Sequence, residues 1–409
     1  MSLDSAVQEE LLSIVGAGLS RVDGAKCVEA ALEKIMPPKK LGVVAIGKAA
    51  PAMLEGAFTV LGRRINSGLL ITKAIANHLQ LPRNITCHIA GHPVPNEASL
   101  QAGQALVEYL KEKPVDFPLL FLISGGASAL VEVPKENVTL SQLQSLNKFL
   151  LNSGLDIIEM NAIRQQVSKI KAGGLLNYIN AKHCWCLLMS DVVTNDVSII
   201  GSGLLTPASV KINKAVLPEW VKQICEINQS DVADRKNLDQ EIEQSIIADL
   251  ASALSAMASA AKQASRACHI HNRNLTGNVE AVANDIVGTL NGASKGIHLW
   301  GGETTIEIGM SQGKGGRNTH LALLLASKLR GIPNCMIAAI ASDGDDGNSG
   351  CAGAIVDGET LNTAGIDKTL TEKALNDYDS ASLLEQAGAL LHFAPGRSNI
   401  ADLVVAIKH

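Results

Sequence analysis

Short apolar runs that end in loops of glycine and serine recur along this chain, and they constrain its fold more than any other feature. The strongest runs are Leu41–Ile46, Leu119–Ile123, Cys184–Met189 and Cys335–Ala341. Longer segments with apolar residues at helical spacing lie between many of these runs. Strands that alternate with helices in this way predict an α/β fold, in which a mostly parallel sheet has helices on both faces.

The composition and length support more than one such layered domain. Hydrophobic residues make up 46% of the chain and aromatic residues only 3%, so the core must be built from Ala, Leu, Ile and Val. A chain of 409 residues exceeds the usual size of a single core. We expect two α/β domains, a Rossmann-like domain at 1–235 and a second domain at 236–409. Residues 208–240 would form the region between them, and Glu241–Ala267 would be one long Ala-rich helix.

Several classes of partner are disfavoured by the sequence. The net charge is −5 and no block of like charge appears, so no nucleic-acid partner is expected. No apolar run approaches about 20 residues, which argues against a membrane span. The N-terminus lacks the pattern of a signal peptide, and a cytoplasmic protein is expected. The eight cysteines are irregularly spaced, so neither a disulfide framework nor a Cys184-x-Cys186 metal site is expected.

Two loops in the N-terminal half are candidate anion sites. Gly42–Lys48 has the spacing of a P-loop, but the residues between its glycines are strand-like and Ala49 stands where Ser or Thr should be. Lys48 still lies at a strand end near a helix N-terminus, where a phosphate or carboxylate is favoured. The loop Ser124-Gly125-Gly126-Ala127-Ser128 offers N–H groups and hydroxyls to an anion. The alternatives are a solvated surface lysine and an ordinary turn.

A group of polar residues at helical spacing follows these loops. Asn161, Arg164, Ser168 and Lys171 are three, four and three residues apart, so in a helix they would share one face. A solvated stripe normally mixes charges of both signs, whereas this face carries no acid. We therefore interpret it as a surface that faces an anion.

Two loops in the C-terminal half suggest phosphate chemistry. Gly313-Lys314-Gly315-Gly316-Arg317-Asn318 combines a flexible backbone, two cations and a following helix, and Arg317 suits bidentate contact with a phosphate or carboxylate. Ser342-Asp343-Gly344-Asp345-Asp346-Gly347 carries three acids that could bind Mg²⁺ together with substrate phosphates. The alternatives are a hairpin loop with incidental charges and a solvated turn.

Taken in order, these loops resemble those of the two-domain glycerate 2-kinase family, whose C-terminal region is called the MOFRL domain. The resemblance covers roughly residues 40–205 and 296–407. The motifs that carry it are Ile46–Ala50, Gly91–Asn96, Ile123–Leu130, Met160–Arg164, Ser168–Leu175, Ser190–Val192, Gly301–Thr305, Gly313–Asn318, Asp343–Gly347 and Ala352–Ala354. Each motif is modest, but their number and order make the resemblance specific.

The resemblance implies transfer of the γ-phosphoryl group of ATP to the 2-hydroxyl of D-glycerate, at a site in the cleft between the domains. It implies Lys48 and Arg317 as catalytic residues, and Asp191 is our first candidate for accepting the hydroxyl proton. Mg²⁺ would bind at Glu303, Asp343 and Asp346. The expected substrate- and nucleotide-binding residues are Ser124, Gly125, Gly126, Ser128, Asn161, Arg164, Lys171, Gly315, Gly316 and Asn318. The partner is a small hydroxy acid, and a homodimer is a candidate assembly.

The chain departs from the family pattern in its binding loops, at 193–206 and 394–399. His320 stands where the family usually has Glu, and Arg397 is an extra cation that suggests a more acidic acceptor. These changes leave open a kinase that acts on a different small hydroxy acid. Because some relatives carry the name hydroxypyruvate reductase, an NAD(P)H oxidoreductase is an alternative, although no G-x-G-x-x-G follows a strand. A non-catalytic binding protein is a further alternative.

Overall fold

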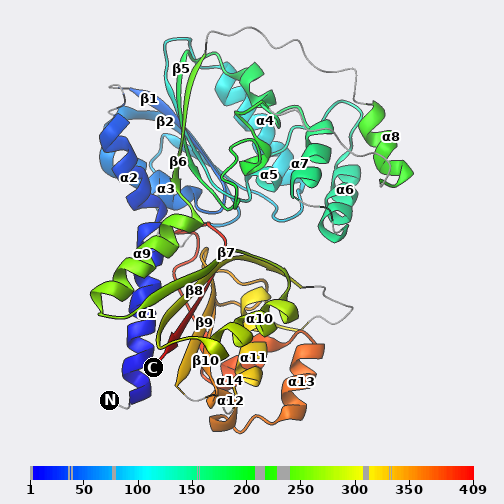
Figure 1. Cartoon of the computed structure of the whole chain (residues 1–409). Coiled ribbons are helices and arrows are strands. Elements are labelled where there is room, and N and C mark those ends of the chain that lie inside the picture. The colour runs from blue at the N-terminus through cyan, green and yellow to red at the C-terminus, as the bar shows by residue number, and fades with distance from the viewer. Residues whose placement is uncertain are drawn as a thin grey trace. The chain divides into compact units, whose positions relative to one another are not determined.

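The computed structural model describes residues 3–35, 37, 40–75, 80–153, 155, 157–207, 217–227, 240–306, 313–330, 332 and 334–409. The chain divides into two compact units, one of Gly24–Ile247 and the other of Met1–Asp23 together with Ala248–His409 (Figure 1). We call them the central unit and the terminal unit. The division expected from the sequence, 1–235 and 236–409, differs from this one in two places: it puts residues 1–23 with the first domain and residues 236–247 with the second.

The central unit contains a sheet of six strands among the described residues, in the order β3-β2-β1-β4-β5-β6. The strands are β1 Leu41–Ile46, β2 Ile65–Thr72, β3 Ile85–Ile89, β4 Leu119–Ile123, β5 His183–Met189 and β6 Glu241–Ala248. Strands β3, β2, β1, β4 and β5 pair in parallel, which confirms the mostly parallel sheet. This order is that of the Rossmann fold, and its topological switch point lies between β1 and β4.

Helices cover both faces of this sheet. The helices of the unit are α2 Gly24–Ile35, α3 Ala50–Leu61, α4 Glu97–Lys111, α5 Ala127–Leu130, α6 Leu140–Asn152, α7 Ile157–Gln166 and α8 Glu219–Ile227, with short 3₁₀ turns at Gly62–Arg64, Gly174–Tyr178 and Ile200–Ser202. One face packs its side chains against α4 and α5, whereas α2 and α3 contact the strands from the other side. α6, α7 and α8 share a smaller apolar cluster of their own.

The terminal unit has a mixed sheet of six strands in its described part, in the order β11-β10-β9-β12-β8-β7. The strands are β7 Cys268–Asn278, β8 Gly296–Thr305, β9 Cys335–Ala341, β10 Gly353–Asp357, β11 Leu390–Leu391 and β12 Asp402–Lys408. β12 runs antiparallel to both of its neighbours, β8 and β9. The carboxyl ends of β8 and β9 therefore lie at the same edge of the sheet as the start of β12, and this edge carries the candidate residues.

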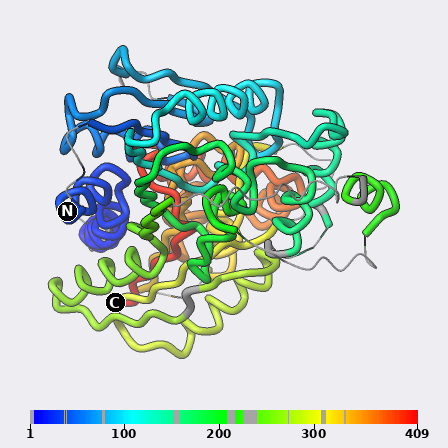
Figure 2. The backbone as a smooth tube through the Cα atoms, turned by 90° about the horizontal axis from the view of Figure 1, so that it is seen from above, coloured from blue at the N-terminus to red at the C-terminus, as the bar shows by residue number. Residues whose placement is uncertain are grey.

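Helices also flank this second sheet on both sides. They are α1 Leu3–Arg21, α9 Leu250–Gln263, α10 Val279–Gly292, α11 Arg317–Lys328, α12 Thr360–Thr363, α13 Lys368–Asn376 and α14 Ser380–Gln386. α10 and α11 pack on one face around the buried Trp300. On the other side, α1 lies beside α9, and both helices contact the sheet (Figures 1 and 2).

Two predictions about local structure are wrong. The long helix expected at Glu241–Ala267 is a strand, β6, followed by α9, because Asp249 caps a new helix by accepting the Ser252 N–H. The apolar residues of β6 also alternate, so that Ile242 and Ile246 pack on the same core. The helix expected at 157–171 ends at Gln166, so its predicted polar face does not extend to Ser168 and Lys171. Of the expected interdomain region 208–240, only 217–227 and 240 lie within the described residues.

Candidate active site

The loops after β1 and β4 meet at the switch point of the central unit. The Lys48 N–H donates to the Gly125 carbonyl oxygen over 3.0 Å, and the Ala49 N–H donates to Ser124 Oγ, also over 3.0 Å. Gly47 has a φ of 133°, and a Cβ there would lie 2.1 Å from Ser124 Oγ, so only glycine permits this close approach. The structure thus brings Lys48, Ser124 and Gly125 together at the end of the sheet where α/β folds bind ligands.

Lys48 and His92 both border Gly126, which precedes the first residue of α5. Gly126 has a left-handed φ of 85°. A Cβ at this position would lie 3.2 Å from Lys48 Cγ and 3.1 Å from His92 Cδ2, so both side chains pass close to the glycine. His92 belongs to the family motif Gly91–Asn96, but no role was predicted for it. It lies just past the end of β3, two strands from β1, and this position could have indicated that it is near the site.

Three predicted binding residues form one polar network in the central unit. Ser128 Oγ and Ser202 Oγ share a hydrogen bond of 2.8 Å, and Ser202 Oγ also donates to Asn161 Oδ1 over 2.8 Å. Arg164 Nη1 reaches the same Asn161 oxygen at 3.5 Å. Ser202 was missed, because it lies in the loop at 193–206, which departs from the family pattern. Its φ of 59° shows that the backbone is turned sharply to present this hydroxyl.

Asp191, the predicted proton acceptor, lies two residues past the end of β5 and is partly buried. The neighbouring Ser190 Oγ accepts the Val192 N–H over 3.2 Å and donates to the Val192 carbonyl, which fixes this turn. Because β5 pairs in parallel with β4, Asp191 lies at the same edge of the sheet as the Gly125 loop. Its role in proton transfer stays a prediction.

Lys171 meets an acid that the sequence analysis did not assign. Its Nζ lies 2.5 Å from Glu132 Oε2, and the two side chains are 2% and 1% exposed. Glu132 Oε1 accepts the Ser168 hydroxyl over 2.5 Å and the Val133 N–H over 3.0 Å. Burial lowers the pKa of Lys171 below its ordinary value, and Glu132 offsets only part of this effect. The polar residues at 161–171 were expected to face an anion. For Ser168 and Lys171, that anion is the carboxylate of Glu132.

In the terminal unit, the glycine loop 313–318 is braced from within. Three of its N–H groups donate to protein acceptors: Lys314 N to Asp379 Oδ1 (2.9 Å), Gly315 N to Asn348 Oδ1 (2.7 Å) and Gly316 N to Thr319 Oγ1 (2.8 Å). A backbone nest binds an anion through N–H groups that have no other acceptor. As it stands, this loop is a support for the start of α11, and the direct binding roles of Gly315 and Gly316 stay predictions.

Asp346 secures the first turn of α11. Its Oδ1 accepts the Asn318 N–H over 2.9 Å, and its Oδ2 accepts the Thr319 N–H over 2.8 Å. These are two of the helix N–H groups that no helical carbonyl can satisfy. Burial raises the pKa of Asp346, whereas the N–H donors lower it. The carboxylate therefore acts as a helix cap that holds Arg317, the first residue of α11.

Arg317 lies between two carboxylates on adjacent strands. Its Nη1 donates to Glu303 Oε1, and its Nη2 lies 3.4 Å from Asp402 Oδ2. Burial alone would lower the pKa of Arg317, but Asp402 and Glu303 outweigh burial and raise it, so the guanidinium is charged. Burial raises the pKa of Asp402 to about 7, although Arg317 pulls it down. Asp402 was missed because its only signal was an acid at the start of an apolar strand.

The carboxylates expected to bind Mg²⁺ do not fit a resident metal centre. Asp346 uses both oxygens to cap α11, and Glu303 faces Arg317. Asp343 Oδ1 accepts the Asp345 N–H over 3.1 Å. Within the part of the chain that the structure describes, no three His, Cys, Asp or Glu side chains gather as metal ligands.

The two unusual residues noted near the site have local partners in the terminal unit. Arg397 pairs bidentately with Asp23, with its Nε 2.8 Å and its Nη2 2.9 Å from the carboxylate oxygens. The extra cation thus supports the join between α1 and the C-terminal loop, which weakens the suggestion of a more acidic acceptor. The His320 ring is buried and stacks on Tyr378, with centroids 5.8 Å apart.

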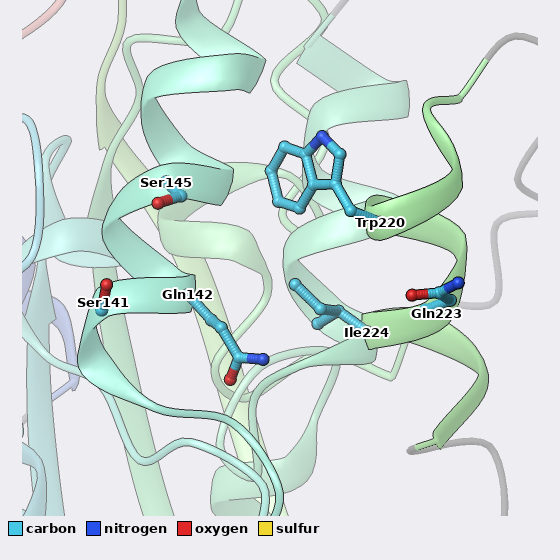
Figure 3. Close-up of a pocket in the computed structure, with 6 residues that line it drawn as sticks. All are labelled: Ser141, Gln142, Ser145, Trp220, Gln223 and Ile224. Carbon is cyan, nitrogen blue, oxygen red and sulfur yellow. The ribbon is translucent and has the colours of Figure 1, made fainter.

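A separate open pocket of about 440 Å³ lies in the central unit (Figure 3). It is lined by Ser141, Gln142 and Ser145 of α6 and by Trp220, Gln223 and Ile224 of α8. None of the predicted site residues lines it.

All eight cysteines are free thiols, and Cys184 and Cys186 are buried in the core. No helix in the described ranges has the length and apolarity to cross a membrane.

Comparison with known proteins accounts for almost the whole chain. The model of a domain of unknown function, DUF4147, matches residues 10–269, and the MOFRL family model matches residues 296–402. The chain is 29% identical to the D-glycerate 2-kinase of Thermotoga maritima, over 97% of each protein. The chain belongs to the two-domain glycerate 2-kinase family. The suspected resemblance is thereby confirmed.

Other members of the glycerate 2-kinase family and their structures agree. The glycerate 2-kinase of Pyrococcus horikoshii is 31% identical, over 90% of this chain and 87% of that one. A protein of Agrobacterium vitis provisionally named hydroxypyruvate reductase is also 31% identical, with the same coverage. The crystal structure of Thermotoga maritima glycerate kinase superimposes with a TM-score of 0.82 at 28% identity, covering 99% of this chain and 100% of that one.

Proposed function

We propose that this protein is an ATP-dependent kinase that phosphorylates the 2-hydroxyl of D-glycerate to give 2-phosphoglycerate. The observation that carries the proposal is the end-to-end match with D-glycerate 2-kinase, combined with Lys48 at the switch point of a Rossmann-order sheet. A cation at that position, beside Gly125 and Gly126, suits a phosphate or a carboxylate.

In the proposed reaction, the 2-hydroxyl oxygen attacks the γ-phosphorus, and the bond from that phosphorus to the β–γ bridging oxygen breaks. ADP leaves, and Asp191 takes the hydroxyl proton. Phosphoryl transfer needs mainly positioning and stabilisation of charge. Lys48 and Arg317 would supply that charge to the transferred group or to the glycerate carboxylate. Ser128, Asn161 and Arg164 would orient the substrate through their shared network.

Two assays test this proposal. ADP formation is followed with D-glycerate and Mg-ATP, and the product is examined by ³¹P NMR. A phosphate on the 2-oxygen couples to one carbon-bound proton and gives a doublet, whereas one on the 3-oxygen couples to two and gives a triplet. Lys48→Ala and Arg317→Ala should each lower turnover at least 100-fold. Unchanged turnover in either variant would remove that residue from the mechanism.

A second candidate is an NAD(P)H-dependent hydroxypyruvate reductase, because the strand order is that of dinucleotide-binding folds and one relative carries that name. Loss of 340-nm absorbance with hydroxypyruvate and NADPH, in the absence of ADP formation, would favour this candidate. ADP formation with another small hydroxy acid, in preference to D-glycerate, would keep the kinase and change its acceptor. If neither signal appeared with any of these substrates, a binding protein would be favoured.

A further inference from the structure

The guanidinium of Arg317 already contacts carboxylates in the places where a substrate anion would bind. Glu303 accepts a hydrogen bond from Nη1, and Asp402 lies beside Nη2. With Asp346 nearby, three acids surround one cation. An arriving phosphate or carboxylate would meet a region of net negative charge, so Arg317 can bind it well only if one of these acids withdraws.

The two partners of Arg317 differ in their freedom to move. The Glu303 side chain is 53% exposed, whereas the Asp402 side chain is 10% exposed. Asp402 belongs to a central strand and pairs with Gly302 on one side and with Ala341 on the other. Glu303 belongs to the next strand, near its carboxyl end, where a side chain can turn into solvent.

Energetics favour the same division of roles. An exposed ion pair contributes little to stability, because water solvates both groups well when the pair opens. Separating a buried pair leaves an uncompensated charge in the interior and is strongly unfavourable. Glu303 is therefore the partner that an anion can replace, whereas Asp402 stays beside the guanidinium.

We infer that Glu303 occupies the anion position of Arg317 until the anionic group of the substrate displaces it, while Asp402 is a positioning residue that keeps Arg317 aligned. The inference deepens the proposed function and rests on it for the identity of the anion. It assigns Asp402 a role that acts through Arg317. It also makes the affinity of the site for anions depend on the charge of Glu303.

Binding of inorganic phosphate, measured by isothermal titration calorimetry, tests the exchange without requiring any turnover. Glu303→Gln keeps the shape of the side chain but removes the competing charge, so its phosphate Kd should fall at least threefold below that of the wild type. Glu385→Gln is the matched control, because Glu385 forms a similarly exposed pair with Lys314 of the neighbouring loop. Its phosphate Kd should equal that of the wild type. Arg317→Ala should abolish the gain when combined with Glu303→Gln.

Steady-state kinetics with D-glycerate and Mg-ATP test the positioning residue. Asp402→Asn keeps the size of the side chain and should lower kcat at least tenfold with little change in the KM for glycerate, whereas Glu303→Gln should lower that KM. If Asp402→Asn simply reduced the amount of folded protein, the apparent kcat would fall in proportion to the circular dichroism signal of the variant. An Asp402→Asn protein that folds and keeps its kcat would overturn the role of Asp402.

The phosphate measurement decides the exchange even if Asp402→Asn fails to fold. Glu303→Gln that binds phosphate as the wild type does, or more weakly, would overturn the exchange. Tighter phosphate binding in Glu303→Gln without glycerate kinase activity would support the exchange and count against the proposed function. If the protein phosphorylates D-glycerate but Glu303→Gln shows no gain in phosphate affinity, the proposed function is supported and the exchange is refuted.

Discussion

The buried pair of Lys171 and Glu132 allows a quantitative prediction. Glu132→Gln keeps the shape of the side chain but leaves the Lys171 ammonium without a counter-charge in the interior. Removing one partner of a buried ion pair typically costs about 3–5 kcal/mol. The ammonium can escape by losing its proton, which at pH 7 costs about 4.6 kcal/mol for a lysine of ordinary pKa near 10.4. Both routes give a loss of about 3–5 kcal/mol in the free energy of unfolding at pH 7.

The second route also fixes the pH dependence of that loss. In Glu132→Gln, the lysine stays neutral down to a lower pH in the folded state than in the unfolded state, so the unfolded state binds more protons. Stability of the variant relative to the wild type therefore rises with pH below about 10.4. At pH 9 the cost of deprotonation is about 1.9 kcal/mol, so the loss should shrink by about 2–3 kcal/mol between pH 7 and pH 9.

Urea unfolding at pH 7 and pH 9 measures both quantities, with the fluorescence of Trp185 and Trp220 as reporters in the central unit. The control is Glu136→Gln in the same unit, whose partner Lys169 lies 3.6 Å away and whose pair is partly exposed, with 34% for Lys169 and 77% for Glu136. It should change the free energy of unfolding by about 0.5 kcal/mol or less. The double variant Glu132→Gln with Lys171→Met should recover much of the loss. A loss below about 1 kcal/mol, or one that does not vary with pH, would refute the reasoning.

Three further predictions concern single positions. Asp346→Ala removes the cap of α11 and should lower the free energy of unfolding by about 1–2 kcal/mol in urea, with Asp346→Asn losing less. Gly126→Ala crowds Lys48 and should lower kcat at least tenfold. The control is Gly388→Ala, because Gly388 also has a left-handed φ but lies in open space. It should lower the free energy of unfolding by about 1 kcal/mol and leave kcat unchanged. Because the folded-state pKa of Asp402 is about 7, the wild type should lose stability as pH rises from 4 to 7. Asp402→Asn should remove that slope, of up to about 1.4 kcal/mol per pH unit, in pH-dependent thermal unfolding.

Local patterns predicted the fold well where one signal dominated. β4 and β9 begin and end at the predicted residues, because each is a short apolar run that is followed directly by a serine. The start of α4 also follows a local signal, because Asn96 is a residue type that favours the helix N-cap and it accepts the Ser99 N–H. β7 was not predicted, because its polar residues owe their place in the sheet to pairing with β8, a contact that lies outside any local window.

The candidate site was predictable as a set of loops but not as a set of contacts. The loops after β1 and β4 were predicted as candidate anion sites, and the structure shows that they contact each other through the Lys48 N–H and the Gly125 carbonyl. The partners Glu132 and Asp402 could not be inferred, because each is a single acid whose importance arises from a cation distant in the sequence. The same limit explains the glycine loop at 313–318, whose N–H groups find acceptors in Asn348 and Asp379.

The terminal unit is assembled from both ends of the chain, and this has a consequence for synthesis on the ribosome. Arg397 joins Asp23 across 374 positions, and Arg266 joins Glu10 across 256. α1 is made before the central unit, whereas the strands that it packs against, β9 and β12, are made after the central unit. Domains otherwise tend to fold in order from the N-terminus. During translation the apolar face of α1 must therefore stay exposed, or be bound by a chaperone, until β9 and β12 have been made.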